Sequence, residues 1–233
     1  MRSVGVTQDL GRVPPLVAVL AVCLSVLPAR AIDPGEAADA LSVVERYNAC
    51  IRFAEGAVES LRVRQDMNEP QADGTMRQAR AVLSYRRGKG MERLVLSSNL
   101  AYPAGEYTLA SLIGPVLELP EYSVRLDGTD VVDGVDCYHL VVEAIERDKD
   151  HLDGDVWVSR ASFAPVRIAG TVASPPFPLA EIRLDKRFAP APGGIALLRS
   201  HTGEVRTGLL LGRKRGIRHI TYRDYVVNGV VGK

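Results

Sequence analysis

Hydrophobic and polar positions follow a helical period near the start of the chain. Residues 33–36 read Asp-Pro-Gly-Glu, which places a capping residue before a Pro at the first helical position. Apolar residues then recur at intervals of three and four, at Ala37, Leu41, Val44, Tyr47, Ile51 and Ala54. The pattern predicts an amphipathic helix of about five turns, whose apolar face needs a sheet to lie against.

From Val58 the period changes to two, which is typical of strands with one buried and one solvated face. Turn residues, mostly Gly, Pro, Asn and Asp, separate these segments. The predicted strands cover 58–67, 80–86, 91–97, 122–126, 137–145, 154–160, 164–172, 179–188, 194–201, 204–211 and 217–227. Short connections make neighbouring strands antiparallel, and a sheet of about eleven strands must curl or close. The expected fold is α+β and mostly β, with the sheet forming a barrel or half-barrel.

A crowded apolar segment, Glu106 to Leu119, interrupts the strands. Five large apolar residues recur at helical spacing around Gly114-Pro115, and they are Leu109, Leu112, Ile113, Val116 and Leu117. The spacing predicts a short helix that is kinked or split at Pro115. Two interpretations stay open: the helix fills the core, or it forms a movable lid over an apolar cavity.

The N-terminal residues have the pattern of an export signal. Arg2 and Arg12 precede an apolar run over residues 16–27, and Ala29-Arg30-Ala31 follows with small residues at the spacing of a cleavage site. We expect a signal peptide over residues 1–31 and a single domain over residues 32–233. A retained N-terminal anchor is the alternative, although the run is shorter than the roughly 20 residues that span a bilayer. A lipid-anchored form through Cys23 is less favoured, because Val22 stands where a small residue is needed.

Charge and cysteine content narrow the function classes. The chain has a formal charge of +1, which gives no reason to expect nucleic acid, because binding to phosphates relies on clustered Lys and Arg. Cys50 and Cys137 remain after the signal segment, and a cysteine pair in an exported chain is commonly a disulfide. Two buried free thiols are the alternative interpretation.

Candidate chemistry is sparse along the chain. Residues 127–136 and 148–155 are acidic. In an EF-hand loop that began at Asp148, however, Leu152 and Ser159 would stand where oxygen ligands are needed, so solvated turns are expected. The four histidines show no zinc-binding spacing, and neither a G-x-S-x-G elbow nor a glycine-rich phosphate loop occurs. We therefore expect no enzyme, no catalytic or metal-binding residue and no cofactor.

Three motifs in the second half carry a family resemblance. Residues 133–140 read Asp-Gly-Val-Asp-Cys-Tyr-His-Leu, residues 154–160 read Gly-Asp-Val-Trp-Val-Ser-Arg with Pro-Val-Arg at 165–167, and residues 220–228 read Ile-Thr-Tyr-Arg-Asp-Tyr-Val-Val-Asn. In order and spacing over about 100 residues the chain resembles the LolA/LolB-like lipoprotein-carrier superfamily of bacterial envelopes. It departs from the best-studied carriers in its sparse aromatic residues, 6% of the chain, and in its two mature cysteines.

The resemblance implies an unclosed antiparallel half-barrel with helices covering its concave face and an apolar cavity that holds acyl chains. It implies a monomeric periplasmic carrier of lipid or lipoprotein, with an inner-membrane donor and an outer-membrane acceptor. The cavity or lid candidates are Leu109, Leu112, Ile113, Val116, Leu117, Trp157, Ile182 and Leu184. Alternation places Val156 and Val158 on one face of their strand and Trp157 on the other, so only one of these sets faces the cavity.

A second function stays open beside the carrier. The resemblance extends to RseB-like envelope sensors, which bind a membrane protein partner instead of transferring lipid. Such sensors carry a second domain, whereas residues 32–233 are expected to form one. We therefore favour the carrier and keep the interaction module as the alternative.

Overall fold

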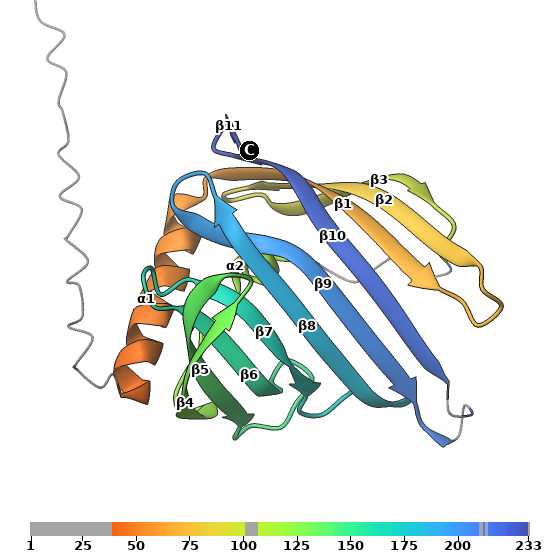
Figure 1. Ribbon diagram of the computed structural model, residues 1–233. Helices are drawn as coiled ribbons and strands as arrows, with labels where there is room; N and C mark the ends of the chain where they lie inside the picture. The colour runs from red at the N-terminus through yellow and green to blue at the C-terminus, as the bar shows by residue number, and fades with distance from the viewer. Residues whose placement is uncertain (1–38, 101–106, 210–211, 213, 233) are drawn as a thin grey trace, which may run out of the picture. The chain divides into compact units, whose positions relative to one another are not determined.

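The dominant feature of this computed structural model is one curved antiparallel sheet, and the structure describes residues 39–100, 107–209, 212 and 214–232 (Figure 1). The helices are α1 Ala40–Ala57 and α2 Leu109–Ile113. The strands are β1 Ser60–Pro70, β2 Met76–Arg86, β3 Gly90–Ser98, β4 Tyr122–Val132, β5 Val135–Ala144, β6 Leu152–Ser159, β7 Pro165–Val172, β8 Leu179–Ala191, β9 Ile195–Thr207, β10 Arg215–Val227 and β11 Val230–Val231.

The sheet has 11 strands and is not closed. Its strand order is β3-β2-β1-β10-β9-β8-β7-β6-β5-β4, with β11 paired to β10, so β3 and β4 form the two ends. The first and last long strands, β1 and β10, are neighbours, and this pairing joins the N-terminal three strands to the rest of the sheet. The predicted unclosed half-barrel is confirmed.

Helix α1 covers the concave face with one apolar side. Its N-cap is Asp39, whose side chain accepts a hydrogen bond from the Ser42 backbone N–H at 2.7 Å. The buried side chains are Val43, Val44, Tyr47, Asn48, Ile51 and Ala54. Leu41 was predicted on this face but is 55% exposed, while the predicted start at residues 33–36 lies outside the described residues. Among the described helices, neither has the length and apolar content needed to cross a bilayer.

Strand β9 differs from the sequence prediction. The segments 194–201 and 204–211 were expected to be two strands, because Gly203 resembled a turn residue. In the structure β9 runs unbroken through this position, and Gly203 pairs with Leu184 of β8 and Arg218 of β10. Cross-strand pairing on both sides holds the glycine extended, so its propensity for turns does not decide the local structure. The short strand β11 was not predicted.

The two faces of the sheet bury separate apolar clusters. The main core joins α1 and α2 to the concave face and includes Val156 and Val158 of β6. Trp157, between them in sequence, packs on the convex face with Val132, Cys137 and Val166. The two-residue period of the strand therefore sends Trp157 away from the helices.

Candidate functional site

A pocket of about 440 Å³ lies on the concave face of β8, β9 and β10, the long strands that extend beyond α2 in Figure 1. Its volume lies within the roughly 300–1,000 Å³ range of small-molecule sites. The lining residues are Glu69, Tyr107, Ser111, Ile182, Leu184, Lys186, Leu198, His201, Gly203, Val205, Gly216, Ile217, Arg218, Ile220 and Tyr222. Most of them contribute aliphatic or aromatic surface, so the pocket is suited to an apolar ligand.

Strand register builds the floor of this pocket in three rows. The rows across β8, β9 and β10 are Lys186–His201–Ile220, Leu184–Gly203–Arg218 and Ile182–Val205–Gly216. Residues directly opposite one another on one face have Cβ atoms about 4.5–5.5 Å apart, so each row is a continuous strip. Two of the predicted cavity residues, Ile182 and Leu184, belong to this floor.

Gly203 leaves the centre of the floor open. A Cβ atom at this position would meet only the Nε2 atom of His201, at 3.6 Å. Any larger residue would project its side chain into the pocket. A glycine inside a strand therefore has a physical role here, because it makes room between Leu184 and Arg218.

Helix α2 closes one side of the pocket without lining it with its apolar residues. Thr108 caps the helix through a reciprocal pair of hydrogen bonds with Ser111, and Ser111 borders the pocket. Three of the five predicted lid residues, Leu112, Ile113 and Leu117, are buried in the main core, and Leu109 and Val116 pack against it. None of these five lines the pocket, so this structure places them in core packing.

Buried hydrogen bonds fix the chain just after α2. The Tyr47 hydroxyl donates to the Pro115 carbonyl at 2.8 Å. The Asn48 side chain donates to the Leu117 carbonyl at 2.9 Å and accepts from the Leu117 N–H at 2.8 Å. Because this segment has such partners on α1, the structure favours a helix that fills the core over a movable lid.

The charged groups of the pocket are unevenly paired. Arg218 donates two hydrogen bonds to Glu69, at 3.0 and 2.6 Å. Burial opposes ionisation of Glu69, but the hydrogen bonds from Arg218 and Gln71 outweigh it and lower the pKa of Glu69. Lys186 has no carboxylate within 4.0 Å among the described residues, and burial lowers the pKa of its amine.

His201 and the two tyrosines are neutral groups of the same pocket at physiological pH. Burial, with a smaller effect of the Lys186 charge, lowers the pKa of His201 to about 4. The buried Nε2 atom of His201 has no hydrogen-bond partner among the described residues. Burial also raises the pKa of Tyr107 and Tyr222. Among the described residues that line the pocket, Lys186 is therefore the charged group without a counter-charge nearby.

Lys186 is not among the residues predicted from the sequence, although its place on an apolar strand face could have identified it. In the sequence, one face of the strand carries the apolar residues Ile182, Leu184 and Phe188. The other face carries the charged residues Glu181, Arg183, Asp185 and Arg187. Lys186 stands between Leu184 and Phe188 on the apolar face. A basic residue on an otherwise apolar strand face departs from the local pattern. Such departures are expected at functional or strained positions.

Trp157 lies outside the pocket, which corrects its prediction as a cavity residue. Its ring stacks on His139, and its Nε1 donates to Asp130 at 3.2 Å. The Arg167 guanidinium lies 4.8 Å from the ring centroid. These partners belong to the convex face, so Trp157 stabilises the sheet there.

The two cysteines are free thiols in the structure. This agrees with the interpretation as two free thiols and not with the disulfide. Cys50 lies on α1, which packs on the concave face, whereas Cys137 is buried in the convex cluster beside Trp157. The sheet separates the two side chains. Burial raises the pKa of both thiols, which lowers their reactivity at neutral pH.

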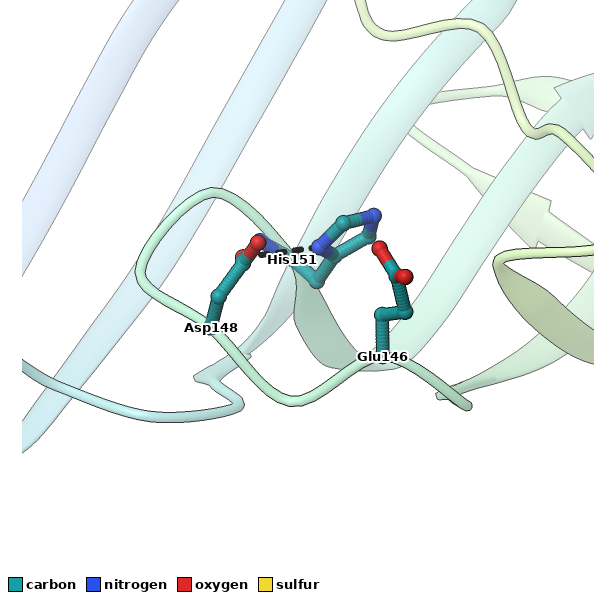
Figure 2. A group of neighbouring side chains, drawn as sticks. All are labelled: Glu146, Asp148 and His151. Atoms are coloured by element: carbon teal, nitrogen blue, oxygen red, sulfur yellow. Dashed lines mark hydrogen bonds and ion pairs between the residues drawn. The ribbon is translucent and has the colours of Figure 1, made fainter.

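A histidine and two carboxylates meet in the turn before β6, where the sequence suggested a solvated loop. Ligand atoms of Glu146, Asp148 and His151 lie within 4.8 Å of one another, and Figure 2 shows the two carboxylates on either side of the ring. Nδ1 of His151 bonds to Asp148 at 2.7 Å and Nε2 to Glu121 at 3.2 Å. The hydrogen bond to Asp148 is the main cause that raises the pKa of His151. With both ring nitrogens engaged, this histidine connects the turn to the residue just before the start of β4.

Comparisons with known proteins show similarity at the level of fold. No family model matches the chain, and no characterised protein matches its sequence. A LolA superfamily protein from Nitrosomonas europaea is 13% identical over 83% of this chain and 96% of its own, with a TM-score of 0.43. A DUF1329 family protein from Desulfovibrio piger is 12% identical over 79% of this chain and 93% of its own, with a TM-score of 0.45. The Mycobacterium tuberculosis lipoprotein LppX is 11% identical over 79% and 95%, with a TM-score of 0.26.

These solved structures are similar to this chain over most of its length.

Proposed function

We propose that this chain is an exported carrier that shelters acyl chains of a lipid or lipoprotein in the concave pocket. The observation that supports this function is the pocket itself, about 440 Å³ in volume and floored by Ile182, Leu184, Val205 and Ile220. The role we propose is lipoprotein sorting or lipid transfer in the periplasm, between an inner-membrane donor and an outer-membrane acceptor. The predicted signal peptide over residues 1–31 supports export.

The energetics of the pocket suit reversible binding. Each methylene group that leaves water for an apolar surface gains about 0.8 kcal/mol. A chain of several methylenes along Leu184, Val205 and Ile182 would therefore bind without any covalent step or metal. Hydrogen bonds hold the segment just after α2 to α1, so we expect binding without a rearrangement of this segment.

The test is uptake of an uncharged apolar dye. N-phenyl-1-naphthylamine should become fluorescent on binding, and Leu184→Gln should weaken its affinity by about tenfold, because a polar amide would replace apolar floor. Arg183→Gln is the matched control: its side chain lies on the opposite face and bonds to Glu181, so affinity should not change. Native mass spectrometry of the protein purified from a bacterial envelope should show bound lipid. Protein that carries no lipid and takes up no dye would refute the proposal.

A second candidate function is supported by the edge strand β3. Leu94, Val95 and Leu96 are 64%, 45% and 52% exposed at the open end of the sheet. Unpaired edges with apolar side chains are sites where another chain can add a strand. An interaction module would use this edge to bind a membrane protein, as the alternative interpretation of the sequence requires. Affinity capture that recovers one stoichiometric membrane protein, lost in Leu94→Lys and kept in Leu184→Gln, would favour this function.

A further inference from the structure

The unpaired amine of Lys186 distinguishes one row of the pocket floor from the others. The alternation of β8 places Ile182, Leu184 and Lys186 on the concave face. The neighbouring carboxylate, Asp185, lies on the convex face, where it accepts hydrogen bonds from Arg167 at 3.0 and 2.7 Å. Asp185 is therefore committed elsewhere and does not neutralise Lys186.

The other charged groups of the pocket are also committed. Glu69 accepts two hydrogen bonds from Arg218, and the residues directly opposite Lys186 are His201 of β9 and Ile168 of β7, neither of which is a carboxylate. A partly buried cation without a counter-charge is unfavourable unless an anion joins it. Among the described residues, the side chains of the pocket therefore leave the positive charge of Lys186 unmatched.

His201 supplies a second polar atom beside this charge. It stands directly opposite Lys186 in the register of β8 and β9, and its buried Nε2 has no partner among the described residues. A neutral imidazole donates from one ring nitrogen, so Nε2–H can complete the contact with an oxygen of a ligand. Lys186 and His201 are cross-strand neighbours on one face, so an ammonium and an N–H lie side by side there and can bind a compact anion.

On β8 and β9 the floor positions nearer the strand ends are apolar, and Arg218, which completes one of these rows on β10, is paired with Glu69. Leu184 with Gly203, and then Ile182 with Val205, lead from Lys186 toward the ends of β8 and β9 that lie away from α2 in Figure 1. Four residues of strand span about 13 Å, which gives an apolar path of that length. The polar group therefore lies at the inner end of the pocket and the apolar path runs outward from it.

We propose that the pocket binds an amphiphile with a compact anionic head, a carboxylate or a phosphate monoester, whose head contacts Lys186 and His201 and whose acyl tail follows Leu184, Gly203 and Ile182 outward. This inference rests on the proposed acyl-binding function and names the ligand class of the same pocket. The gap left by Gly203 admits the tail between Leu184 and Arg218.

The experiment compares three ligands with the same tail, dodecanoate, dodecyl phosphate and dodecanol, as competitors of N-phenyl-1-naphthylamine on the full chain. A hydrogen bond to a charged group contributes about 1.5–3 kcal/mol, so one anion or both should bind about ten- to a hundredfold more tightly than dodecanol. Lys186→Met keeps the aliphatic stem and should abolish the preference, while dodecanol affinity stays within about twofold. Lys186→Arg keeps the charge and should retain a preference for the anion.

The control is a substitution of a lysine that lies outside the pocket. Lys89→Met removes an exposed lysine in the turn between β2 and β3 and should leave all three affinities unchanged. Preference for dodecanoate would assign a carboxylate head, and preference for dodecyl phosphate a phosphate head. Equal binding of all three ligands, unchanged by Lys186→Met, would overturn this inference and leave the acyl-binding function intact. Binding of none of them would overturn both.

Discussion

The imidazole of His139 lies parallel to the indole of Trp157, with ring centroids 4.9 Å apart and planes inclined by 3°. The guanidinium of Arg167 covers the same indole at 4.8 Å. Three neighbouring strands, β5, β6 and β7, thus contribute one stacked layer to the convex face. Because the pocket is on the concave face, the stability of this layer and the binding of a ligand are separable.

Trp157→Ala should therefore destabilise the protein without weakening ligand binding. Removal of a largely buried tryptophan commonly costs about 3–5 kcal/mol, because apolar burial and ring contacts are lost. Equilibrium unfolding in urea measures the loss, and dye titration at low temperature measures affinity. Trp157→Phe keeps an aromatic ring and should lose less stability. Loss of dye binding in a Trp157→Ala protein that is still folded would contradict the assignment of Trp157 to the convex face.

Gly203→Val should block the pocket. The new side chain would project between Leu184 and Arg218, where a Cβ atom would have only one neighbour, and a β-branched residue suits an extended strand. We expect the dye affinity to fall by about tenfold or more while the midpoint of thermal unfolding changes little. Thr202→Val, on the other face of β9, is the matched control. Full dye affinity in Gly203→Val would place the ligand elsewhere.

Asn48→Leu should destabilise the protein through the segment after α2. The substitution leaves the N–H and the carbonyl of Leu117 buried without their partners, and each unpaired group costs about 1–3 kcal/mol. Unfolding in urea gives the change in stability, and hydrogen exchange at the Leu117 amide should become faster. Glu45→Ala, on the exposed side of α1, should change stability by less than about 0.5 kcal/mol. Unchanged exchange at Leu117 would show that the two hydrogen bonds do not hold this segment.

Stability should fall as the pH is lowered from about 6.5 to about 4 through His201. The pKa of this residue is about 4 in the folded protein and about 6.5 in an unfolded chain, so between these values the unfolded state binds the additional proton. The contribution of His201 is thus present above pH 6.5 and is lost on acidification. Urea unfolding at pH 5 and pH 7.5 measures it, and His201→Gln should show a smaller difference between the two pH values. An equal difference in both proteins would contradict the buried neutral imidazole.

The periodicity of the chain was sufficient to predict the sheet. Alternation with period two marks a strand wherever one face is buried, and it located most of the strands to within a few residues. Gly203 was read wrongly because a lone glycine in a sequence is more typical of a turn, and only pairing with Leu184 and Arg218 shows that the strand continues. Pairing with residues remote in sequence outweighed the turn propensity of the glycine.

The pocket was less predictable than the fold. Ile182 and Leu184 were found from their alternation, but this pattern alone does not say which of the two faces is concave, and the candidate Trp157 lies on the convex one. The apolar residues of α2 were attractive candidates because of their size, yet Leu112 and Ile113 fill the core. Which apolar residues line a cavity depends on how the sheet curves around α2, and that is a property of the assembled fold.

The hydrogen bonds from Tyr47 and Asn48 that fix the segment after α2 have a consequence for kinetics. Under the proposed function, this fixed segment does not have to move before the cargo dissociates. Exchange would then be first order in loaded protein, with a rate set by how much apolar surface the cargo buries. A cargo with a short acyl chain would dissociate before the loaded protein meets an acceptor. A cargo with a long acyl chain would stay bound until an acceptor is met.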